Sequence, residues 1–485
     1  MYINELIDLV NPLHVSRTKP EEELHRLVQD SRQITEGSVF IAVRGHEVDG
    51  HMFLEDAIQR GAKVLITEES YYTDADGVCV IEVENTRTLV GKLAQAFAGN
   101  PAKKLLIIGI TGTNGKTTTA TLVHQILSKT GKKASLLGTV SKKILEEEIS
   151  SSLTTSDPIE LANDMKMMVE AGSDYLVMEV SSHALIQSRV SGFDFSVAAF
   201  TNLSHDHLDY HVTVEEYAKA KKILFDTLPK TSVAIINADD QYGAYMLSDC
   251  KAKNVLLSFG TEHSYILSNS STGLKLSVEG VNIDSPLIGK FNAYNVAQAY
   301  LICKELGLSP SSISKALSTS SGAAGRMQSI EIENAPLAIV DYAHTPDALE
   351  NVLSTLSQVK EKDQKLTVIF GAGGDRDSSK RPEMAQVVEK YADTIFVTSD
   401  NPRFEDPEKI ISDVLVGFEK KAKVISITNR KDAIERAIAE SDVRNIVLIA
   451  GKGHEDYQDI KGVKHLFDDR VIAKGALELY SKGGN

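Results

Sequence analysis

The chain of 485 residues has few of the features that mark a secreted, membrane-spanning or nucleic-acid-binding protein. Its three cysteines, Cys79, Cys250 and Cys303, are far apart and form neither a disulfide framework nor a metal-binding knuckle. No apolar run approaches the ~18 residues that a membrane-spanning helix needs. The formal net charge of −15 argues against nucleic acid as a ligand, because proteins that bind it usually carry a basic surface.

The absence of other sequence features limits the class of protein further. The first ten residues, MYINELIDLV, are acidic and amphipathic, unlike a signal peptide. The sequence contains no internal repeat, no low-complexity tract and no obvious Ser–His or Cys–His pair for covalent catalysis. We therefore expect a soluble, cytoplasmic and monomeric protein that binds neither membranes nor nucleic acid.

The length predicts about three domains at the usual ~150 residues each. We place them at 1–100, 101–327 and 328–485. Short strand-like runs at 38–43, 62–67 and 77–83 precede a helical pattern that ends at Gly99-Asn100-Pro101. Strands and helices alternate in the second domain, apart from a turn-rich stretch at 258–289 that we interpret as antiparallel. The fold class is therefore α/β.

The sequence of the third domain predicts a doubly wound, Rossmann-like sheet. Five strand-like runs follow one another between helical patterns, at 337–344, 366–375, 394–402, 424–429 and 445–455. Three of them end in polar, glycine-containing or proline-containing loops: GAGGDRD at 371–377, SDNPR at 399–403 and AGKGHE at 450–455. Ligands of such sheets bind beyond the carboxyl ends of the strands, so these loops are candidate binding residues.

The stretch TGTNGKTTT, residues 111–119, predicts a phosphate-binding loop between a strand and a helix. Backbone N–H groups and the helix N-terminus bind anions in such loops, while a lysine reaches the outer phosphates and a threonine ligates Mg²⁺. The predicted ATP-binding residues are Gly112, Thr113, Asn114, Gly115, Lys116, Thr117 and Thr118. The loop is a variant, because Ile110 stands where the common pattern has glycine.

Two polar segments follow predicted strands of the second domain. Glu179, in MEVSSHAL, is a natural Mg²⁺ ligand at a strand end. The segment TNLSHDHLDYH, residues 201–211, holds three histidines and two aspartates, which indicates metal binding or acid–base work. A zinc site and a solvated loop are the alternatives. The next segment, EEYAKAKKILF at 215–225, has the pattern of a surface helix with solvated lysines.

GTNGKTTT, at this position in the chain, resembles the Mur ligase family and its folylpolyglutamate synthase relatives. The resemblance extends over essentially the whole chain and keeps the order of the motifs. It implies a three-domain enzyme that uses ATP and Mg²⁺ to activate a carboxylate as an acyl phosphate, which an amine then attacks. Val212 departs from the family pattern, where many members have glycine.

The resemblance also assigns residues to ATP and magnesium. It implies that Lys221 is carbamylated and so becomes an anion that can hold magnesium, with His207 at a second magnesium ion. Together with Lys116 and Glu179, these form the expected catalytic group, and the expected metal ligands are Thr117, Glu179, His207 and carbamylated Lys221. Further nucleotide contacts are expected from Asn292, Arg326, Asp341 and His344.

The first domain narrows the choice of substrate. DSRQITEGSVFIAVRGHEVDGHMF, at 30–53, resembles the uridine-nucleotide domain of the family member that adds the third residue of the peptidoglycan stem peptide. The resemblance implies a UDP-muramoyl-dipeptide substrate. The residues expected to bind it are Ser31, Thr154, Thr155, Ser181, Gln187 and Arg189.

The motif DNPR accompanies meso-diaminopimelate as the added amino acid in this family. Diaminopimelate differs from lysine by an extra carboxylate at its far end, and an arginine fork grips a carboxylate with two hydrogen bonds. The residues expected to bind it are Arg376, Asp400, Asn401, Pro402, Arg403, Gly451 and Glu455. Three alternatives stay open: a lysine-adding ligase, a folylpolyglutamate synthase, and a P-loop ATPase that works as a switch or motor.

Overall fold

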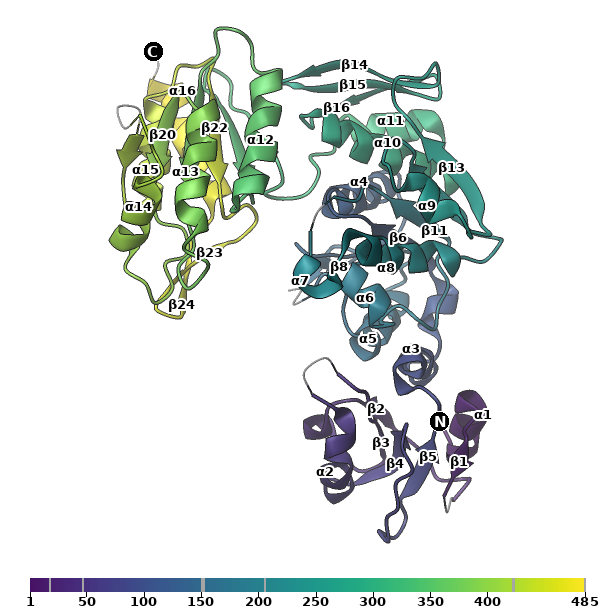
Figure 1. Cartoon of the computed structure of the whole chain (residues 1–485). Helices are drawn as coiled ribbons and strands as arrows, with labels where there is room; N and C mark the ends of the chain where they lie inside the picture. The colour runs from purple at the N-terminus through teal and green to yellow at the C-terminus, as the bar shows by residue number, and fades with distance from the viewer. Residues whose placement is uncertain (17–18, 46–47, 150–152, 205, 421–423, 484–485) are drawn as a thin grey trace. The chain divides into compact units, whose positions relative to one another are not determined.

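A computed structural model describes residues 1–485 apart from 17–18, 46–47, 150–152, 205, 421–423 and 484–485 (Figure 1). The chain forms two compact units, Met1–Leu257 and Ser258–Asn485. The first unit contains two sheets, and the predicted boundary at residue 100 falls between them. The other predicted boundary, after residue 327, immediately precedes a strand that begins at Gln328.

The first sheet has five strands in the order β1-β5-β4-β3-β2. Its strands are β1 His14–Val15, β2 Arg26–Val28, β3 Ser38–Ile41, β4 Ala62–Thr67 and β5 Cys79–Glu82. Helices α1 Ile3–Val10 and α3 Thr86–Phe97 cover one face, and α2 Leu54–Gln59 covers the other. The three predicted strands and the helix before Gly99 are confirmed, whereas β1 and β2 are too short to leave a pattern in the sequence.

The second sheet has eight strands in the order β13-β12-β11-β6-β10-β7-β8-β9. It is parallel from β13 to β7, and β8 and β9 pair antiparallel at its edge. The strands are β6 Leu106–Thr111, β7 Ala134–Leu137, β8 Lys142–Ile144, β9 Glu147–Ile149, β10 Tyr175–Glu179, β11 Val197–Phe200, β12 Val233–Asn237 and β13 Lys253–Leu257. Each parallel strand is followed by a turn or helix, so the strand ends that carry the polar motifs share one edge.

The helices of this part are α4 Lys116–Lys129, α5 Pro158–Glu170, α6 Ser182–Ile186, α7 Leu208–His211, α8 Val214–Asp226 and α9 Gly243–Leu247. Leu161, Met165 and Met168 of α5 pack with Leu224 and Phe225 of α8 in the core of this sheet. Helix α4 packs against β6, β7 and β10.

Helix α3, which covers the first sheet, also packs against α5 and the segment around Ser191, which belong to the part built on the second sheet. A methyl group at Gly91 would lie 1.8 Å from the backbone oxygen of Ser191, so only glycine fits there. The hydroxyl of Ser191 donates to the backbone oxygen of Thr88 at 3.4 Å. Ala162 of α5 is buried in the core under α1 and α3. These contacts join the two sheets into one compact unit.

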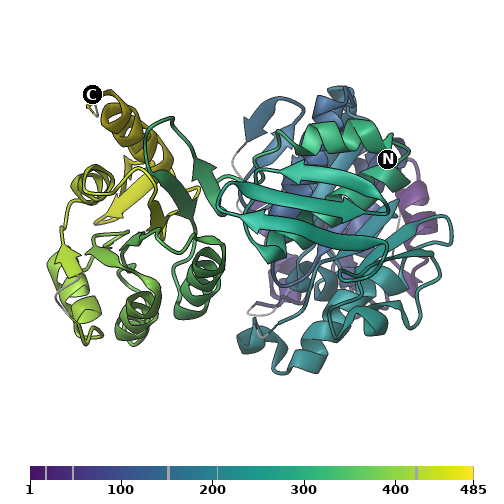
Figure 2. The same cartoon turned by 90° about the horizontal axis from the view of Figure 1, so that it is seen from above.

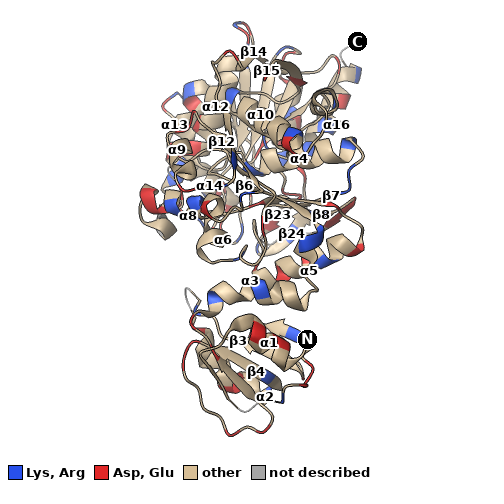
Figure 3. Cartoon of the chain, turned by 90° about the vertical axis from the view of Figure 1, so that its right-hand side faces the viewer, with Lys and Arg blue, Asp and Glu red and all other residues tan. Residues whose placement is uncertain are grey.

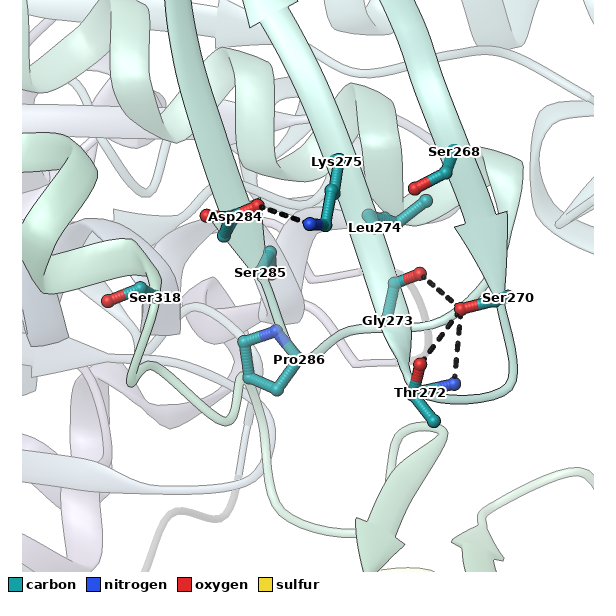
Figure 4. Close-up of a pocket in the computed structure, with 10 residues that line it drawn as sticks. All are labelled: Ser268, Ser270, Thr272, Gly273, Leu274, Lys275, Asp284, Ser285, Pro286 and Ser318. Carbon is teal, nitrogen blue, oxygen red and sulfur yellow. Dashed lines mark hydrogen bonds and ion pairs between the residues drawn. The ribbon is translucent and has the colours of Figure 1, made fainter.

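The second unit begins with an antiparallel sheet, β14 Ser264–Ser270, β15 Gly273–Val278 and β16 Val281–Ser285, which confirms the predicted antiparallel stretch. Helices α10 Lys290–Glu305 and α11 Pro310–Leu317 pack against it, as the view of Figure 2 shows. A shallow pocket lies between the β14–β15 turn and Ser318 (Figure 4). The Ser270 hydroxyl in it bonds the Thr272 hydroxyl and the backbone oxygen of Gly273.

The remaining sheet has six strands in the order β17-β18-β22-β19-β20-β21. They are β17 Gln328–Ile330, β18 Leu337–Asp341, β19 Leu366–Phe370, β20 Thr394–Val397, β21 Val424–Ser426 and β22 Ile446–Ala450. All pair parallel except β17, so the predicted doubly wound sheet is confirmed. A separate hairpin is formed by β23 Tyr457–Ile460 and β24 Val463–Leu466.

Helices cover both faces of this sheet. One face packs against α12 Pro346–Val359, α13 Lys380–Tyr391 and α14 Pro407–Leu415, and the other against α15 Arg430–Ala439 and α16 Asp469–Gly483. Figure 3 shows basic and acidic residues interspersed on the helices that are visible from that side. Within the described ranges, no helix is both long enough and apolar enough to cross a membrane.

Candidate active site

The phosphate-binding loop follows β6 and ends at the first residue of α4, as predicted. Gly115 precedes the helix with a φ of +86°, a conformation that favours glycine. Gly112 lies so close to the next strand end that a methyl group there would come within 1.8 Å of the Thr201 hydroxyl oxygen. That hydroxyl donates to the backbone oxygen of Asn114 at 2.6 Å. The loop is therefore held in shape by the end of β11.

The side chains of the loop point in different directions. Lys116 donates from Nζ to the backbone oxygens of Gly112 at 2.9 Å and Thr113 at 2.8 Å. The Thr113 hydroxyl bonds the Tyr217 hydroxyl at 3.3 Å, which ties the loop to α8. Thr118 is buried inside α4, while Asn114 is exposed.

Thr117, in the first turn of α4, meets Glu179 at the end of β10. The Thr117 hydroxyl donates to Oε2 of Glu179 at 2.9 Å, and the carboxylate is almost wholly buried. Thr139 holds the same carboxylate twice, through its backbone N–H to Oε1 at 2.8 Å and through its hydroxyl to Oε2 at 3.2 Å. Oxygen donors of this kind suit Mg²⁺, so Thr117 and Glu179 fit the predicted magnesium ligands.

The expectation that the lysines of 215–225 are solvated is wrong for two of them. Lys221 is 1% exposed and Lys222 is 6% exposed, whereas Lys219 is solvated and pairs with Glu216. The error has a physical cause: α8 packs one face against the sheet, and the long aliphatic stems of both lysines contribute to that face. Lys222 is paired with Asp226 and Asp249.

Lys221 lies beside the phosphate-binding loop. Its Nζ donates to the backbone oxygen of Gly112 at 2.8 Å and lies 4.3 Å from the centre of the Tyr217 ring. Burial, with a smaller contribution from the Lys116 ammonium, lowers the pKa of Lys221 well below its usual value. No carboxylate is paired with it among the salt bridges of the described residues. An ammonium is therefore a poor occupant of this position, beside the ammonium of Lys116.

His207 is half-exposed, with its ring 5.1 Å from that of His183 and 6.0 Å from that of Tyr217. Its Nε2 is 3.7 Å from Oδ2 of Asp206. His205 of the same segment lies outside the described residues. In the part of the chain that the structure covers, no three His, Cys, Asp or Glu side chains converge as metal ligands. Val212 has a φ of +67°, which explains why glycine would suit that position.

The residues predicted to hold the muramoyl-dipeptide form one hydrogen-bonded network next to Glu179. The Thr155 hydroxyl donates to the backbone oxygen of Glu179 at 2.9 Å and accepts from the Ser181 N–H at 3.1 Å. Arg189 donates to the backbone oxygen of Thr155 at 2.8 Å.

Two further predicted residues complete this network. Gln187 accepts from Nη2 of Arg189 at 2.7 Å through its Oε1. The hydroxyls of Thr154 and Thr139 lie 3.0 Å apart, so Thr139 bridges the substrate side to Glu179. Burial lowers the pKa of Arg189. Ser31 lies apart from this network, in the part built on the first sheet, where it is buried and bonds Asp56.

Four residues predicted to contact the nucleotide belong to the second unit. Asn292 is buried in α10, where it donates to the backbone oxygen of Ile288 at 2.8 Å and accepts from Asn295 at 2.9 Å. Asp341 accepts from the backbone N–H groups of Met327 at 2.7 Å and Ala343 at 2.8 Å. Burial raises the pKa of Asp341. The carboxylate thus fixes the backbone on both sides of itself.

Arg326 and His344 lie against the ring of Tyr342. The guanidinium carbon of Arg326 is 4.8 Å from the ring centre, and the His344 ring is 4.7 Å away. His454 packs on the same ring at 5.2 Å. Burial and the Arg326 charge lower the pKa of His454. Arg326 thus places a positive charge near Asp341.

The three polar loops of the Rossmann-like sheet come together, as predicted. The N–H of Gly374 donates to the backbone oxygen of Asn401 at 2.9 Å, which joins loops 371–377 and 399–403. The Asn401 amide donates to Oε2 of Glu455 at 2.9 Å, which joins 399–403 to 450–455. A methyl group at Gly451 would lie 2.5 Å from Oδ2 of Asp400, so only glycine allows this approach.

Both predicted arginines lie at this junction. Arg403 donates from Nη1 to the backbone oxygen of Gly374 at 2.6 Å. A methyl group at Gly373 would meet Nη1 of Arg403 at 3.0 Å and Cγ of Arg376 at 3.8 Å, so the two arginines flank this glycine. Arg376 is exposed. Pro402 packs its backbone oxygen against Gly374.

Sequence reasoning did not select three residues that contact predicted site residues, one in the first unit and two in the second. Thr139 follows a strand, β7, that the sequence pattern did not indicate. Lys452 stands inside the quoted loop AGKGHE, yet its charge gave no sign that it would be fully buried. Arg430 is also buried, where it pairs with Asp469 at 2.7 Å and lies 3.9 Å from Oδ2 of Asp400. Its position at the start of α15, after the strand end at 424–429, was the available signal.

Three family models match the chain. They describe the Mur ligase family catalytic domain at residues 23–98, the Mur ligase middle domain at 110–303 and the Mur ligase glutamate ligase domain at 325–453. Among curated proteins, the UDP-N-acetylmuramoyl-L-alanyl-D-glutamate–2,6-diaminopimelate ligase of Phocaeicola vulgatus is 44% identical over 458 residues, or 93% of this chain and 95% of the relative.

Solved structures of the same family also match the chain. A structure of UDP-N-acetylmuramoyl-L-alanyl-D-glutamate–2,6-diaminopimelate ligase matches with a TM-score of 0.75 at 34% identity, over 99% of both chains. The folylpolyglutamate synthase of Mycobacterium tuberculosis, solved with ADP and AMPPCP, matches with a TM-score of 0.58 at 19% identity, over 81% of this chain and 95% of that one. This second likeness concerns the fold alone. The chain belongs to the Mur ligase family.

Proposed function

We propose that this chain is an ATP-dependent ligase that adds meso-2,6-diaminopimelate to UDP-N-acetylmuramoyl-L-alanyl-D-glutamate, a step in making the peptidoglycan precursor. The observation that carries the proposal is the junction of the three loops in the second unit, where Arg403, Arg376 and Glu455 offer both charges that an amino-acid terminus needs. Relatives named for this activity match nearly the full length of the chain.

The phosphate-binding loop supplies the ATP side of the reaction. The loop N–H groups, the N-terminus of α4 and Lys116 bind and orient the phosphates. Thr117 and Glu179 are the residues that would hold Mg²⁺, which neutralises phosphate charge when bound. His207 and carbamylated Lys221 complete the proposed ligand set. Asn292, Arg326, Asp341 and His344 are proposed to contact the nucleotide.

The chemistry needs no protein nucleophile. An oxygen of the D-glutamate carboxylate attacks the γ-phosphorus of ATP, and ADP leaves to give an acyl phosphate. The amine nitrogen of diaminopimelate then attacks the acyl carbon, the amide bond forms, and inorganic phosphate departs while the amine loses a proton. Ser31 is proposed to bind the uridine nucleotide. Thr154, Thr155, Ser181, Gln187 and Arg189 are proposed to hold the dipeptide, so that the carboxylate lies in line with the phosphate.

Phosphate release with ATP, Mg²⁺ and the UDP-muramoyl-dipeptide tests this function, with meso-diaminopimelate and L-lysine compared as amines. We expect release and a product of tripeptide mass with diaminopimelate, and far less of both with lysine. Release that is equally fast without any amine would instead indicate a plain ATPase. Lys116→Ala serves as the inactive control, because it removes the charge that contacts the phosphates.

A further inference from the structure

Lys452 is a fully buried lysine whose ammonium lies between two residues of the proposed amino-acid site. Its Nζ donates to Oδ1 of Asn401 at 3.0 Å and to Oε2 of Glu455 at 3.0 Å. Its side chain has no exposed surface, and the ammonium is 5.4 Å from the centre of the Tyr457 ring. A buried ammonium is costly unless it is paired, and Glu455 is the carboxylate that pairs with it.

The hydrogen bond from Lys452 makes the two carboxylate oxygens of Glu455 differ. Oε2 accepts from both Lys452 and the Asn401 amide, so it is fixed from the protein side. Among the described residues, no hydrogen bond involves Oε1, and the Glu455 side chain is 17% exposed. Oε1 is therefore the atom that remains for a ligand ammonium.

The contact also sets the charge of the site. Lys452 and Glu455 together are neutral, whereas Asp400 and Asp469 share the single cation of Arg430 and leave one negative charge. The arginines Arg403 and Arg376 then leave the site cationic. A ligand end that carries a carboxylate beside its ammonium matches such a site. A ligand end that is a lone ammonium does not, because it would add a further positive charge to a site that is already cationic.

We propose that Lys452 is a specificity-determining positioning residue, which fixes Oε1 of Glu455 toward the substrate and cancels the Glu455 charge, so that zwitterionic amino-acid ends are accepted and lone ammonium ends are rejected. The inference rests on the proposed function and adds to it the reason for choosing diaminopimelate over lysine. Lys452 acts through Glu455 and Asn401 rather than on the reacting atoms.

The test compares Lys452→Met with Lys464→Met in the full-length enzyme. Lys464 is a matched control, because its ammonium also lies near the Tyr457 ring, 4.0 Å from the ring centre. Unlike Lys452, Lys464 is exposed, and no hydrogen bond or ion pair among the described residues joins it to Glu455. The measured quantity is kcat/KM for meso-diaminopimelate divided by kcat/KM for L-lysine. We expect Lys452→Met to lower this ratio by about tenfold or more, because it leaves Glu455 unbalanced, and Lys464→Met to leave it unchanged.

Two more variants test the charge argument even if Lys452→Met does not fold. Glu455→Gln leaves Lys452 unbalanced and should raise the ratio. Adding Lys452→Met to Glu455→Gln restores neutrality and should return the ratio to within about threefold of the wild type, although both rates fall. Thermal unfolding and the KM for ATP report whether each variant is folded.

The outcomes separate the inference from the proposed function. If the wild type forms no amide with either amine, the proposed function fails and the inference fails with it. If the wild type prefers diaminopimelate but Lys452→Met keeps the wild-type ratio, or if the ratio is the same for Glu455→Gln and the double variant, Lys452 has no role in specificity. A fall in both rates with an unchanged ratio would indicate a purely structural lysine.

Discussion

Thr139 and Glu179 are joined by two hydrogen bonds, one from the Thr139 backbone N–H and one from its hydroxyl, so each carboxylate oxygen is held by the same residue. The same hydroxyl lies 3.0 Å from that of Thr154. Thr139 thus fixes the direction of a proposed magnesium ligand and links it to the proposed dipeptide site. Groups that orient metal ligands usually contribute strongly to metal affinity.

Thr139→Val removes the hydroxyl and keeps the backbone bond. We expect the concentration of Mg²⁺ needed for half-maximal activity to rise by about tenfold, since one of the contacts that orient Glu179 is lost. Titration of the phosphate-release rate with Mg²⁺ measures this. Thr272→Val is the matched control, because the Thr272 hydroxyl bonds only Ser270 in the pocket of Figure 4. An unchanged Mg²⁺ dependence in Thr139→Val would remove Thr139 from the metal site.

Lys221→Ala should abolish activity, and short carboxylates added to the solution should restore part of it. The reason is that a carbamate on Lys221 would supply an anion close to Gly112, and a free carboxylate can replace that anion. Mass spectrometry of the intact protein, recorded without acid, gives a second measurement of the carbamate. Lys219→Ala, on the exposed side of the same helix, should retain full activity. Full activity of Lys221→Ala would contradict the carbamate.

Arg403→Lys should lower kcat/KM for diaminopimelate by roughly a hundredfold and change kcat/KM for L-lysine far less. Lysine keeps the charge but loses the planar fork that grips a carboxylate with two bonds. Steady-state kinetics with both amines measures the two values. Arg444→Lys, at an exposed arginine paired with Asp442, controls for the substitution itself. Equal losses with both amines would mean that Arg403 does not bind the carboxylate unique to diaminopimelate.

His124 should make the first unit less stable below about pH 6.5. Burial, and then the Lys143 charge, lower the pKa of His124 in the folded protein, and its Nε2 has no hydrogen-bond partner among the described residues. Below pH ~6.5, His124 therefore binds a proton in the unfolded chain but not in the folded protein. The free energy of unfolding decreases as the pH falls from the unfolded-state pKa of ~6.5 to the lower pKa of the folded state.

The expected loss for His124 is at most about 1.4 kcal/mol for each pH unit within that window. Urea unfolding of the wild type and of His124→Gln between pH 7.5 and pH 5.5 measures it, with the pH values chosen on both sides of ~6.5. Glutamine does not titrate, so the pH dependence of the variant should be smaller than that of the wild type. Parallel curves for the two proteins would show that His124 already accepts a proton in the fold.

The strands and loops of the second unit could be predicted because their apolar runs are long and end in distinctive polar residues. The phosphate-binding loop was equally clear, since its glycines and lysine follow a buried strand. Burial of charged residues was not predictable in the same way. Lys221 and Lys222 differ from Lys219 only in the helix face on which they lie, and the hydrophobic pattern of α8 is too mixed to show that face.

Contacts between segments that are distant in the sequence could not be predicted either. Thr139 and Glu179 are 40 residues apart, and they meet because β7 and β10 are neighbours in the sheet. The short run at Ala134–Leu137 did not stand out as a strand, so this neighbour was missing from the prediction. Lys452 was visible in the sequence, but its partner Asn401 lies 51 residues away.

The close contact between Gly91 and Ser191 limits how the gene can be divided. A fragment that starts at residue 101 would lack α3, and it would expose the surface of α5 around Ala162, which the intact chain covers. We therefore expect such a fragment to aggregate, because newly exposed apolar surface promotes association. Fragments for crystallisation or for inhibitor screening should end near Leu257, where the first compact unit ends, instead of at the boundary that the sequence suggests.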